Sequence, residues 1–285
     1  MAESTAVLAA VDGSEDSLRA VEWAVAEARQ GSRPLVLVHV VPHLLREDDA
    51  PPIADQRTRV DRVLQVARQR AAHAPAVETE VRRLEPLGFE IGPAVVEAAG
   101  PTDTIVVGAR GHGKVTGLVL GSVSQYAARH APGTVVVVRR QSDEAATRTV
   151  VGFDESPSAQ RALDWAMQRA SQHGGGVTAL RTWRGTALHG AANVLPLPVD
   201  ATWQQEKERD ALETELAPWR DKYPGVALLG EAVPGHPGHL LATAAEHAAL
   251  VVVGSRGRGA LAETLLGSVS QAVLHHAHCP VAVVR

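Results

Sequence analysis

The sequence Val106-Val107-Gly108-Ala109-Arg110-Gly111 is followed, after nine further residues, by Gly121-Ser122. The same arrangement returns as Val252-Val253-Gly254-Ser255-Arg256-Gly257, nine residues, and Gly267-Ser268. In each case a run of β-branched residues leads into glycines, and a segment that we expect to be helical follows. A strand, a glycine loop and a helix in that order, present twice, predict an α/β fold made from two copies of one unit.

The repeat covers nearly the whole chain. Asp12 and Trp23 recur 142 residues later, and the segment 121–125 returns unchanged 146 residues later. The second copy therefore carries four extra residues in its middle. The polar stretch 140–148 indicates an exposed linker between the copies. The predicted domains, called copy one and copy two below, are residues 1–140 and residues 148–285.

Bulk properties limit the class of protein. The chain has 285 residues, 45% of them hydrophobic and 3% aromatic, and a net charge of −4. These values suit two packed domains and do not favour a nucleic-acid partner. Cys279 is the single cysteine, residues 1–5 do not resemble a signal peptide, and no apolar run could span a bilayer. We therefore expect a cytoplasmic protein with no membrane partner.

Short apolar runs alternate with longer helical patterns such as 17–30, 55–72 and 203–221. Several runs lack polar alternation, which is typical of parallel strands that helices cover on both faces. We predict two tandem Rossmann-like domains, each with a five-stranded parallel sheet flanked by helices. The predicted strands are 6–11, 35–41, 77–84, 104–107 and 134–138 in copy one, and 149–153, 177–182, 226–231, 250–253 and 281–284 in copy two.

The glycine pattern G-x2-G-x9-G-[ST] favours an anion site. Glycines let backbone N–H groups approach an anion, and the N-terminus of the helix 122–130 attracts phosphate. Ser122 and Ser124 are expected to add hydroxyl donors. Arg110 and Arg256 can add positive charge, or they can point to solvent. A simple turn is the alternative, but the full pattern in both copies favours binding.

Two similar motifs are excluded. Gly108-x4-Gly113-Lys114 resembles a Walker A loop, but Val115 stands where that loop needs Ser or Thr. Copy two has Gly259-Ala260 at the same place, without the lysine. No G-x-G-x-x-G follows the first strand, so the dinucleotide fingerprint is absent too.

Asp12 and Asp154 end the first strand of their copies. Each carboxylate can accept a hydrogen bond from an adenine amine or a ribose hydroxyl. The alternative is a helix cap or an Asx-turn. Val40 and Thr182 end the second strands and would offer backbone groups to the base, while Val41 is matched by Trp183, which gives the second pocket a different shape.

Together Asp12-Gly13-Ser14, Trp23-Ala24, His39-Val40 and both glycine loops resemble the universal stress proteins, in the tandem form common in actinobacteria. The resemblance implies one ATP in each copy. In copy one the implied contacts are Asp12, Val40, Gly108, Gly111, Gly121, Ser122, Val123 and Ser124. In copy two they are Asp154, Thr182, Gly254, Gly257, Gly267, Ser268, Val269 and Ser270.

The resemblance also implies a stress-response nucleotide sensor with weak or no hydrolysis, and a homodimer formed through the last strand. Mg²⁺ can accompany the ATP, although no dedicated ligand stands out. Two departures put equal affinity of the sites in doubt. Copy two has Gly235-His236-Pro237 where copy one has Phe89-Glu90-Ile91, and it has Glu155 where copy one has Gly13.

Other functions are less well supported. A slow ATPase or nucleotidyl-transfer enzyme of related fold should show a general base or a Ser-Gly-Gly-x-Asp-Ser loop, and neither is present. A nucleotide-independent dimeric scaffold would not need the glycine loops. We assign no catalytic residue, no metal site and no particular protein partner. The cluster His275, His276, His278 and Cys279 lacks the spacing of zinc ligands, and we expect Cys279 to enter the core.

Overall fold

A computed structural model describes residues 5–41, 53–72, 77–86, 90–111, 120–139, 146–183, 201–257 and 266–285. These residues form ten strands and eight helices. Copy one contains β1 (Val7–Ala10), α1 (Glu15–Gln30), β2 (Leu35–Val40), α2 (Ile53–Ala71), β3 (Thr79–Leu84), α3 (Ile91–Glu97), β4 (Thr104–Gly108), α4 (Ser122–His130) and β5 (Thr134–Val138). Copy two contains β6 (Thr149–Gly152), α5 (Pro157–His173), β7 (Gly176–Trp183), α6 (Ala201–Lys222), β8 (Ala227–Pro234), α7 (Pro237–Ala244), β9 (Leu250–Gly254), α8 (Ser268–His276) and β10 (Val281–Val284).

All ten predicted strands are present, with small shifts at their ends. The helix expected from Ser17 begins at Glu15, because the hydroxyl of Ser14 accepts a hydrogen bond from the backbone of Ser17 and caps the helix. The strand expected to stop at Glu231 continues to Pro234. The Walker-like segment at Gly113–Val115 and its counterpart Gly259–Ala260 lie outside the described residues, as does Phe89.

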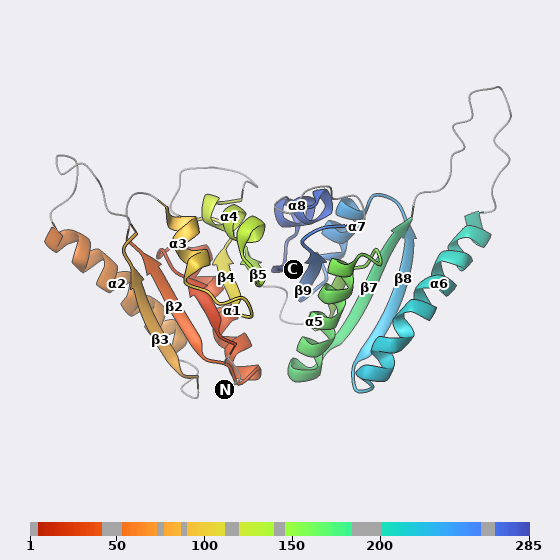
Figure 1. The fold of residues 1–285 in the computed structure, drawn as a ribbon, viewed down its shortest axis with the longest axis horizontal. Coiled ribbons are helices and arrows are strands. Elements are labelled where there is room, and N and C mark those ends of the chain that lie inside the picture. The colour runs from red at the N-terminus through yellow and green to blue at the C-terminus, as the bar shows by residue number, and fades with distance from the viewer. Residues whose placement is uncertain are drawn as a thin grey trace, which may run out of the picture.

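The strands form one continuous sheet in the order β3-β2-β1-β4-β5-β10-β9-β6-β7-β8. Within each copy the five strands are parallel, as predicted. At the centre β5 and β10 pair in antiparallel fashion, with Val137 opposite Val281. Figure 1 shows the resulting arrangement, in which two similar halves meet at their last strands.

This central pairing differs from our prediction. We predicted two separate five-stranded sheets. In the structure the edge strand of one copy pairs with the edge strand of the other, so that all ten strands form one sheet. The resemblance implied dimerisation through the last strand, and in this chain the last strands of the two copies pair with each other. Since paired edges have no unsatisfied backbone groups left for another strand, this edge is not available for a second chain.

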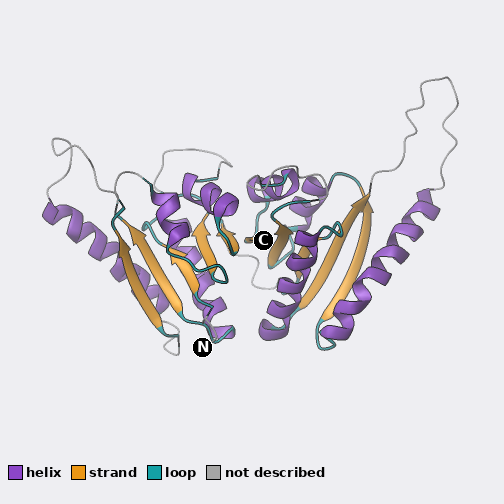
Figure 2. Ribbon diagram, in the orientation of Figure 1, coloured by secondary structure: helices purple, strands orange, loops and turns teal. Residues whose placement is uncertain are grey.

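Helices cover both faces of the sheet (Figure 2). Side chains alternate along each strand, so Val7 and Ala9 join one hydrophobic cluster while Leu8 joins the other. The first cluster lies under α1, α2, α5 and α6, and the second lies under α3, α4, α7 and α8. Both clusters draw residues from both copies, so the two halves share their hydrophobic packing.

Each half has the strand order 3-2-1-4-5, and the order reverses between β1 and β4, or between β6 and β9. Ligands of open α/β sheets bind at such a switch point, beyond the carboxyl ends of the strands. Asp12 follows β1 and the glycine loop follows β4, so the two predicted halves of the site flank the switch point.

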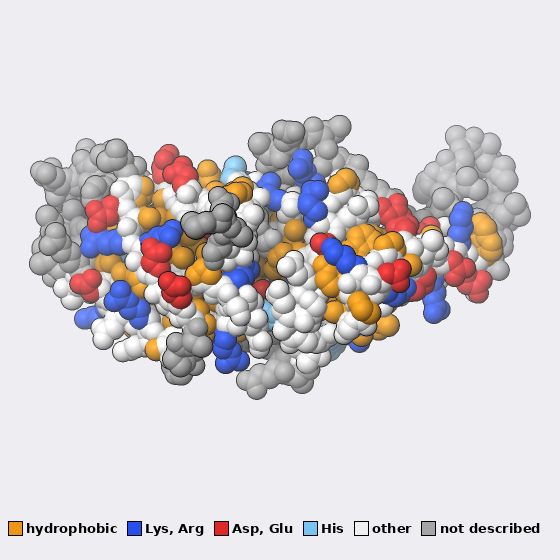
Figure 3. Space-filling view, turned by 60° about the horizontal axis from the view of Figure 1, so that its bottom comes forward, with side chains coloured by type: hydrophobic (Ala, Val, Ile, Leu, Met, Phe, Trp, Pro, Cys, Tyr) orange, Lys and Arg blue, Asp and Glu red, His pale blue; other side chains and the backbone are white. Residues whose placement is uncertain are grey.

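Within the described residues, no helix combines the length and the apolar character needed to cross a membrane. On the face drawn in Figure 3, acidic and basic side chains are interspersed among hydrophobic ones and do not gather into one charged patch.

Candidate functional site

The first glycine of each loop is required by contact with the protein's own helix. A Cβ at Gly108 would lie 2.6 Å from the carbonyl carbon of Asp16, in the first turn of α1. A Cβ at Gly254 would lie 2.6 Å from the Ser158 hydroxyl and 2.8 Å from the carbonyl carbon of Ser158, in α5. We interpreted these glycines as places where a ligand approaches the backbone. The structure gives a separate reason for the lack of a side chain, because the helix that follows the first strand fills the space that a Cβ would occupy.

The second glycine of each loop lies against the aspartate that follows the first strand. A Cβ at Gly111 would collide with Oδ2 of Asp12, and one at Gly257 would lie 2.8 Å from Oδ2 of Asp154. The structure therefore brings together the aspartate and the glycine loop, which are about a hundred residues apart in each copy. The two motifs from which we predicted the site form one local cradle.

Hydrogen bonds hold the second part of each motif onto the first. The N–H of Gly121 donates to Ala109 O at 2.7 Å, and that of Gly267 donates to Ser255 O at 2.9 Å. These bonds place the start of α4 and the start of α8 directly beside their loops. The first-turn N–H groups of a helix lack intrahelical partners, so this end of each helix offers donors to an anion.

The serines of the motif divide into two kinds. Ser124 and Ser270 are each 2% exposed, and their hydroxyls donate to Gly108 O and Gly254 O, both at 2.6 Å. In this structure the Ser124 hydroxyl fastens the loop to the helix, a different role from the phosphate contact that we predicted for it. Ser122 and Ser268 are exposed at the first position of their helices, where a hydroxyl can meet a ligand.

The two aspartates shape the turn before the first helix of their copies. Oδ1 of Asp12 accepts hydrogen bonds from the N–H of Ser14 at 2.9 Å and from its hydroxyl at 2.6 Å. Oδ1 of Asp154 accepts the matching bonds from Ser156 at 3.1 Å and 2.5 Å. The Asx-turn that we considered as the alternative is thus present in both copies. It uses Oδ1, while Oδ2 faces the glycine loop.

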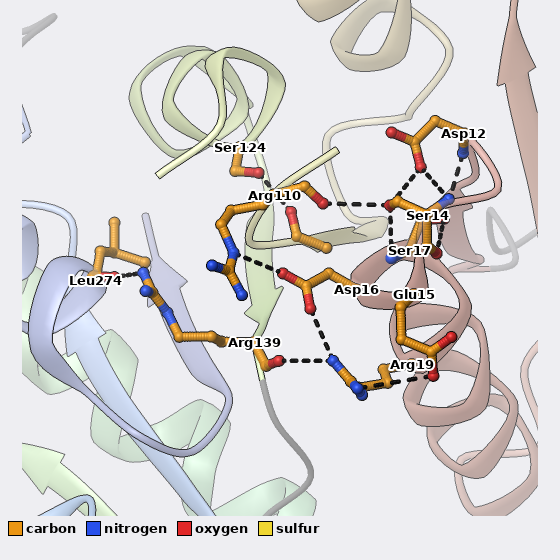
Figure 4. Close-up of polar contacts among 11 residues, drawn as sticks. Asp12, Ser14, Glu15, Asp16, Ser17, Arg19, Arg110, Ser124, Arg139 and Leu274 are labelled. Carbon is orange, nitrogen blue, oxygen red and sulfur yellow. Dashed lines mark hydrogen bonds and ion pairs between the residues drawn. The ribbon is translucent and has the colours of Figure 1, made fainter. Parts of the chain in front are cut away.

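The Arg110 side chain is partly exposed, pairs with a carboxylate of α1 and does not point toward the switch point. Its Nε lies 3.2 Å from Oδ2 of Asp16, a carboxylate that is 6% exposed and also pairs with Arg19 at 2.8 Å. Figure 4 shows the Arg110 side chain extending away from Asp12 toward the side of Arg139, where Asp16 of α1 meets it. This position of the side chain does not favour the direct phosphate contact that we predicted for Arg110.

In copy two the loop arginine has different surroundings. Ser158 stands where copy one has Asp16, and its hydroxyl donates to Arg256 O. Burial lowers the pKa of Arg285, and the nearby charge of Arg256 lowers it further. Copy two therefore has no counterpart of the Asp16 carboxylate that pairs with Arg110 in copy one.

Val40 is the last residue of β2 and Thr182 is the last but one of β7, and both are partly exposed, as a wall of a base pocket requires. Beside them the copies differ. The ring of His39 lies 2.6 Å from Val11 O, whereas Arg181 at the matching place is buried and pairs with Glu155 at 2.8 Å and with Glu215.

The turn after the first strand keeps its conformation in both copies despite the change of residue. Gly13 has φ +87°, and Glu155 has φ +64°, which is unusual for a residue with a side chain. The ion pair with Arg181 compensates for this backbone in copy two. Glu155 and Arg181 thus add a second difference between the copies beside Trp183, from which we predicted a differently shaped second pocket.

Cys279 is buried, as expected, and burial raises the pKa of its thiol to about 12. The described residues contain no group of three His, Cys, Asp or Glu side chains that could hold a metal ion. Sequence reasoning missed Asp16, Arg139 and Arg285, which lie outside the motifs. The repeat contained a signal for the two arginines, because they occupy matching positions directly after the last strand of each copy.

Comparisons with known proteins agree with the tandem arrangement. A family model described as "Universal stress protein family" matches residues 4–139 and again residues 146–285. A universal stress protein of Mycolicibacterium smegmatis is 32% identical over 295 residues, covering 98% of this chain and 96% of that protein. One of Mycobacterium tuberculosis is 32% identical over 301 residues, covering 98% and 94%.

Among solved structures, a universal stress protein from Archaeoglobus fulgidus superposes with a TM-score of 0.70 and covers 99% of both chains. Its sequence identity is 21%, so this likeness concerns the fold alone. The match over the full length of both chains means that the tandem arrangement of two units also occurs in that protein.

Proposed function

The chain belongs to the universal stress protein family, and on that premise we propose that it binds one ATP in each copy and acts as a stress-response nucleotide sensor. The phosphates would lie on the glycine loop and on the N-terminal amides of α4 or α8. The adenosine would lie between Asp12 and Val40 in copy one, and between Asp154 and Thr182 in copy two.

One observation carries this proposal. In both copies the second glycine of the loop lies against Oδ2 of the aspartate across the switch point. An exposed serine begins the adjacent helix in each copy, Ser122 in one and Ser268 in the other. A triphosphate needs convergent backbone donors, and a ribose or an adenine amine needs an acceptor within reach of them. The arrangement supplies both.

We propose a regulatory role rather than an enzymatic one. The buried hydroxyls of Ser124 and Ser270 are engaged with the loop backbone. Oδ1 of Asp12 is engaged by Ser14. These groups support the shape of the cradle and are poorly placed to move a proton in a phosphoryl-transfer step. Mg²⁺ would be held through the phosphates, and we assign it no protein ligand.

The experiment is the nucleotide content of the natively purified protein, released by denaturation and resolved by chromatography. We expect about two ATP per chain. Gly121→Val and Gly267→Val should each remove one, because the branched side chain would fill the approach to the loop beside Ala109 O or Arg256. Gly225→Ala is the matched control, since nothing lies within 4 Å of a Cβ there.

Each other outcome has a distinct meaning. Recovery of ADP that increases on incubation with Mg²⁺ would favour the slow ATPase. Absence of nucleotide, together with no heat of binding on titration with ATP, would reject the proposal and leave the scaffold. Unchanged ATP content in both glycine variants, with unchanged melting temperatures, would overturn the assignment of the loops.

The homodimer that the resemblance implies stays a prediction. Because β5 and β10 pair within the chain, a dimer has to use another surface. Light scattering coupled to size-exclusion chromatography distinguishes a mass near 30.0 kDa from twice that value.

A further inference from the structure

Each copy ends its last strand with an arginine that reaches into the other copy. Arg139 follows β5, and its Nη2 donates to Leu274 O in α8 at 3.2 Å (Figure 4). Arg285 follows β10, and its Nη2 donates to Ala128 O in α4 at 3.1 Å and also to Arg129 O. Leu274 and Ala128 occupy matching positions in the repeat, so the two contacts are reciprocal.

The acceptors are carbonyls that their own helices leave without a partner. The last four carbonyls of an α-helix have no N–H further along the helix to bind. In α4 the N–H of Ala131 takes the carbonyl of Ala127, and Arg285 takes the next two. In α8 the N–H of Ala277 takes the carbonyl of Val273, and Arg139 takes the next. Each arginine is therefore a C-cap supplied by the other copy.

The capped helices are the two whose N-termini lie beside the glycine loops. Each has nine residues, and at 1.5 Å per residue it is about 14 Å long. A cation at the C-terminus and an anion at the N-terminus complement the same helix dipole. A cap that holds the last turn also holds the first, because the helix is too short to bend between them. Arginine contact at one end therefore favours phosphate at the other.

We propose that Arg285 and Arg139 are positioning residues in trans: Arg285 of copy two prepares the phosphate site of copy one, and Arg139 of copy one prepares that of copy two. This inference rests on the proposed ATP binding. It makes each nucleotide site dependent on the copy that does not contain it, and it gives the antiparallel pairing of β5 with β10 a functional consequence.

The surroundings of each arginine fit this role. Arg139 is 8% exposed, and its backbone carbonyl accepts from Arg19 at 3.5 Å, so it is fixed to α1. Burial lowers the pKa of its guanidinium, Arg110 lowers it further, and Asp16 opposes the shift. Arg285 has Arg256 as its charged neighbour. The charge of each crossing arginine is thus felt by the loop arginine of its own copy.

The test is ATP affinity resolved by site, measured by calorimetry on the full chain. Gly267→Val leaves only the copy-one site, and Gly121→Val leaves only the copy-two site. Arg285→Ala should weaken the copy-one site about two- to fivefold, the range expected for a charge at a helix end, and leave the copy-two site unchanged. Arg285→Lys should recover part of the loss, because the cation remains while the second contact is lost.

The reciprocal variant is Arg139→Ala, which should weaken the copy-two site and leave the copy-one site unchanged. Arg83→Ala, at the outer edge of the sheet, is the control for loss of an arginine and should change neither site. Hydrogen exchange gives a second measurement, in which Arg285→Ala should speed exchange in α4 and not in α8.

The outcomes separate the two proposals. If the unaltered chain binds no ATP, the proposed function fails and this inference fails with it. If the chain binds ATP but Arg285→Ala weakens both sites equally, or only the copy-two site, or neither, the inference alone is overturned. Arg285→Lys decides the case in which Arg285→Ala is too unstable to measure.

Discussion

The two copies build the glycine loop with the same contacts and build its neighbourhood with different ones. Ser124 and Ser270 hold their loops through hydrogen bonds of equal length, 2.6 Å. By contrast, Gly13 is replaced by Glu155, and His39 by Arg181. The loop is made by backbone groups and by glycines that contact a helix, so few other residues fit it. The neighbouring wall is made by side chains, and compensating changes are possible there.

A second difference lies where the copies meet. Glu27 in α1 and Arg169 in α5 occupy matching positions in the repeat, yet they carry opposite charges and pair at 2.8 Å. Their side chains are only 5% and 18% exposed. Two identical copies would place like charges at this contact. The fused chain therefore allows its halves to specialise for each other.

The largest expected effect tests this pair. Glu27→Arg should lower the free energy of unfolding by about 3 kcal/mol, because it breaks a buried ion pair and brings two guanidinium groups together. The double variant Glu27→Arg with Arg169→Glu should regain most of the loss. Urea unfolding measures both, and Glu15→Arg, at an exposed position of the same helix, is the control. A double variant as unstable as the single one would contradict specialisation by charge.

The next effect tests whether the loops are equivalent. Gly108→Ala and Gly254→Ala should each cost about 2 kcal/mol, because the new Cβ would overlap with the first turn of α1 or of α5. Thermal unfolding measures the loss, with Gly225→Ala as the neutral control. A clear loss in one copy with none in the other would show that the two loops are packed differently.

A smaller effect tests the compensation at Glu155. Glu155→Gln keeps the strained backbone and removes the charge that pairs with Arg181, so it should cost up to about 1 kcal/mol. Glu155→Gly should be close to neutral, because relief of the positive φ offsets the lost pair. The melting temperatures of the two variants test this compensation. A lower melting temperature for Glu155→Gly than for Glu155→Gln would contradict it.

The smallest expected effect is a dependence of the free energy of unfolding on pH, caused by a histidine of copy two. Burial lowers the pKa of His173, Arg169 also lowers it, and Glu27 opposes the shift. The unfolded chain therefore takes up a proton near pH 6.5 that the folded chain does not accept until lower pH. Stability should fall as the pH drops below about 6.5 and should be unaffected by this group above it.

Copy one has Gly31 at the position that matches His173, so this position of copy one adds no dependence of stability on pH. His173→Gln should remove this part of the acid destabilisation. Unfolding in urea at pH 7.5 and 5.5, values chosen on either side of the ordinary histidine pKa, measures the difference between the variant and the unaltered chain. An equal loss of stability in both proteins would exclude His173 as its source.

Much of the fold and the outline of the site could be predicted, because their signals are local. Runs of β-branched residues predicted the strands, and Ser14 before α1 explains why that helix starts earlier than we placed it. The cradle followed from two motifs at a switch point. The role of Ser124 could not be predicted, since a hydroxyl at that position can face either a ligand or the loop, and only packing decides between them.

By itself, the sequence determined that this protein has two copies of one α/β unit and a glycine loop after the fourth strand of each. Those features follow from hydrophobic periodicity and from the conformational range of glycine, which act over a few residues. Only the tertiary structure decided that β5 pairs with β10, that Glu27 pairs with Arg169, and that Arg285 caps α4. The partners in these contacts are more than a hundred residues apart, and no local pattern specifies which distant group will satisfy a strand edge, a buried charge or a helix end.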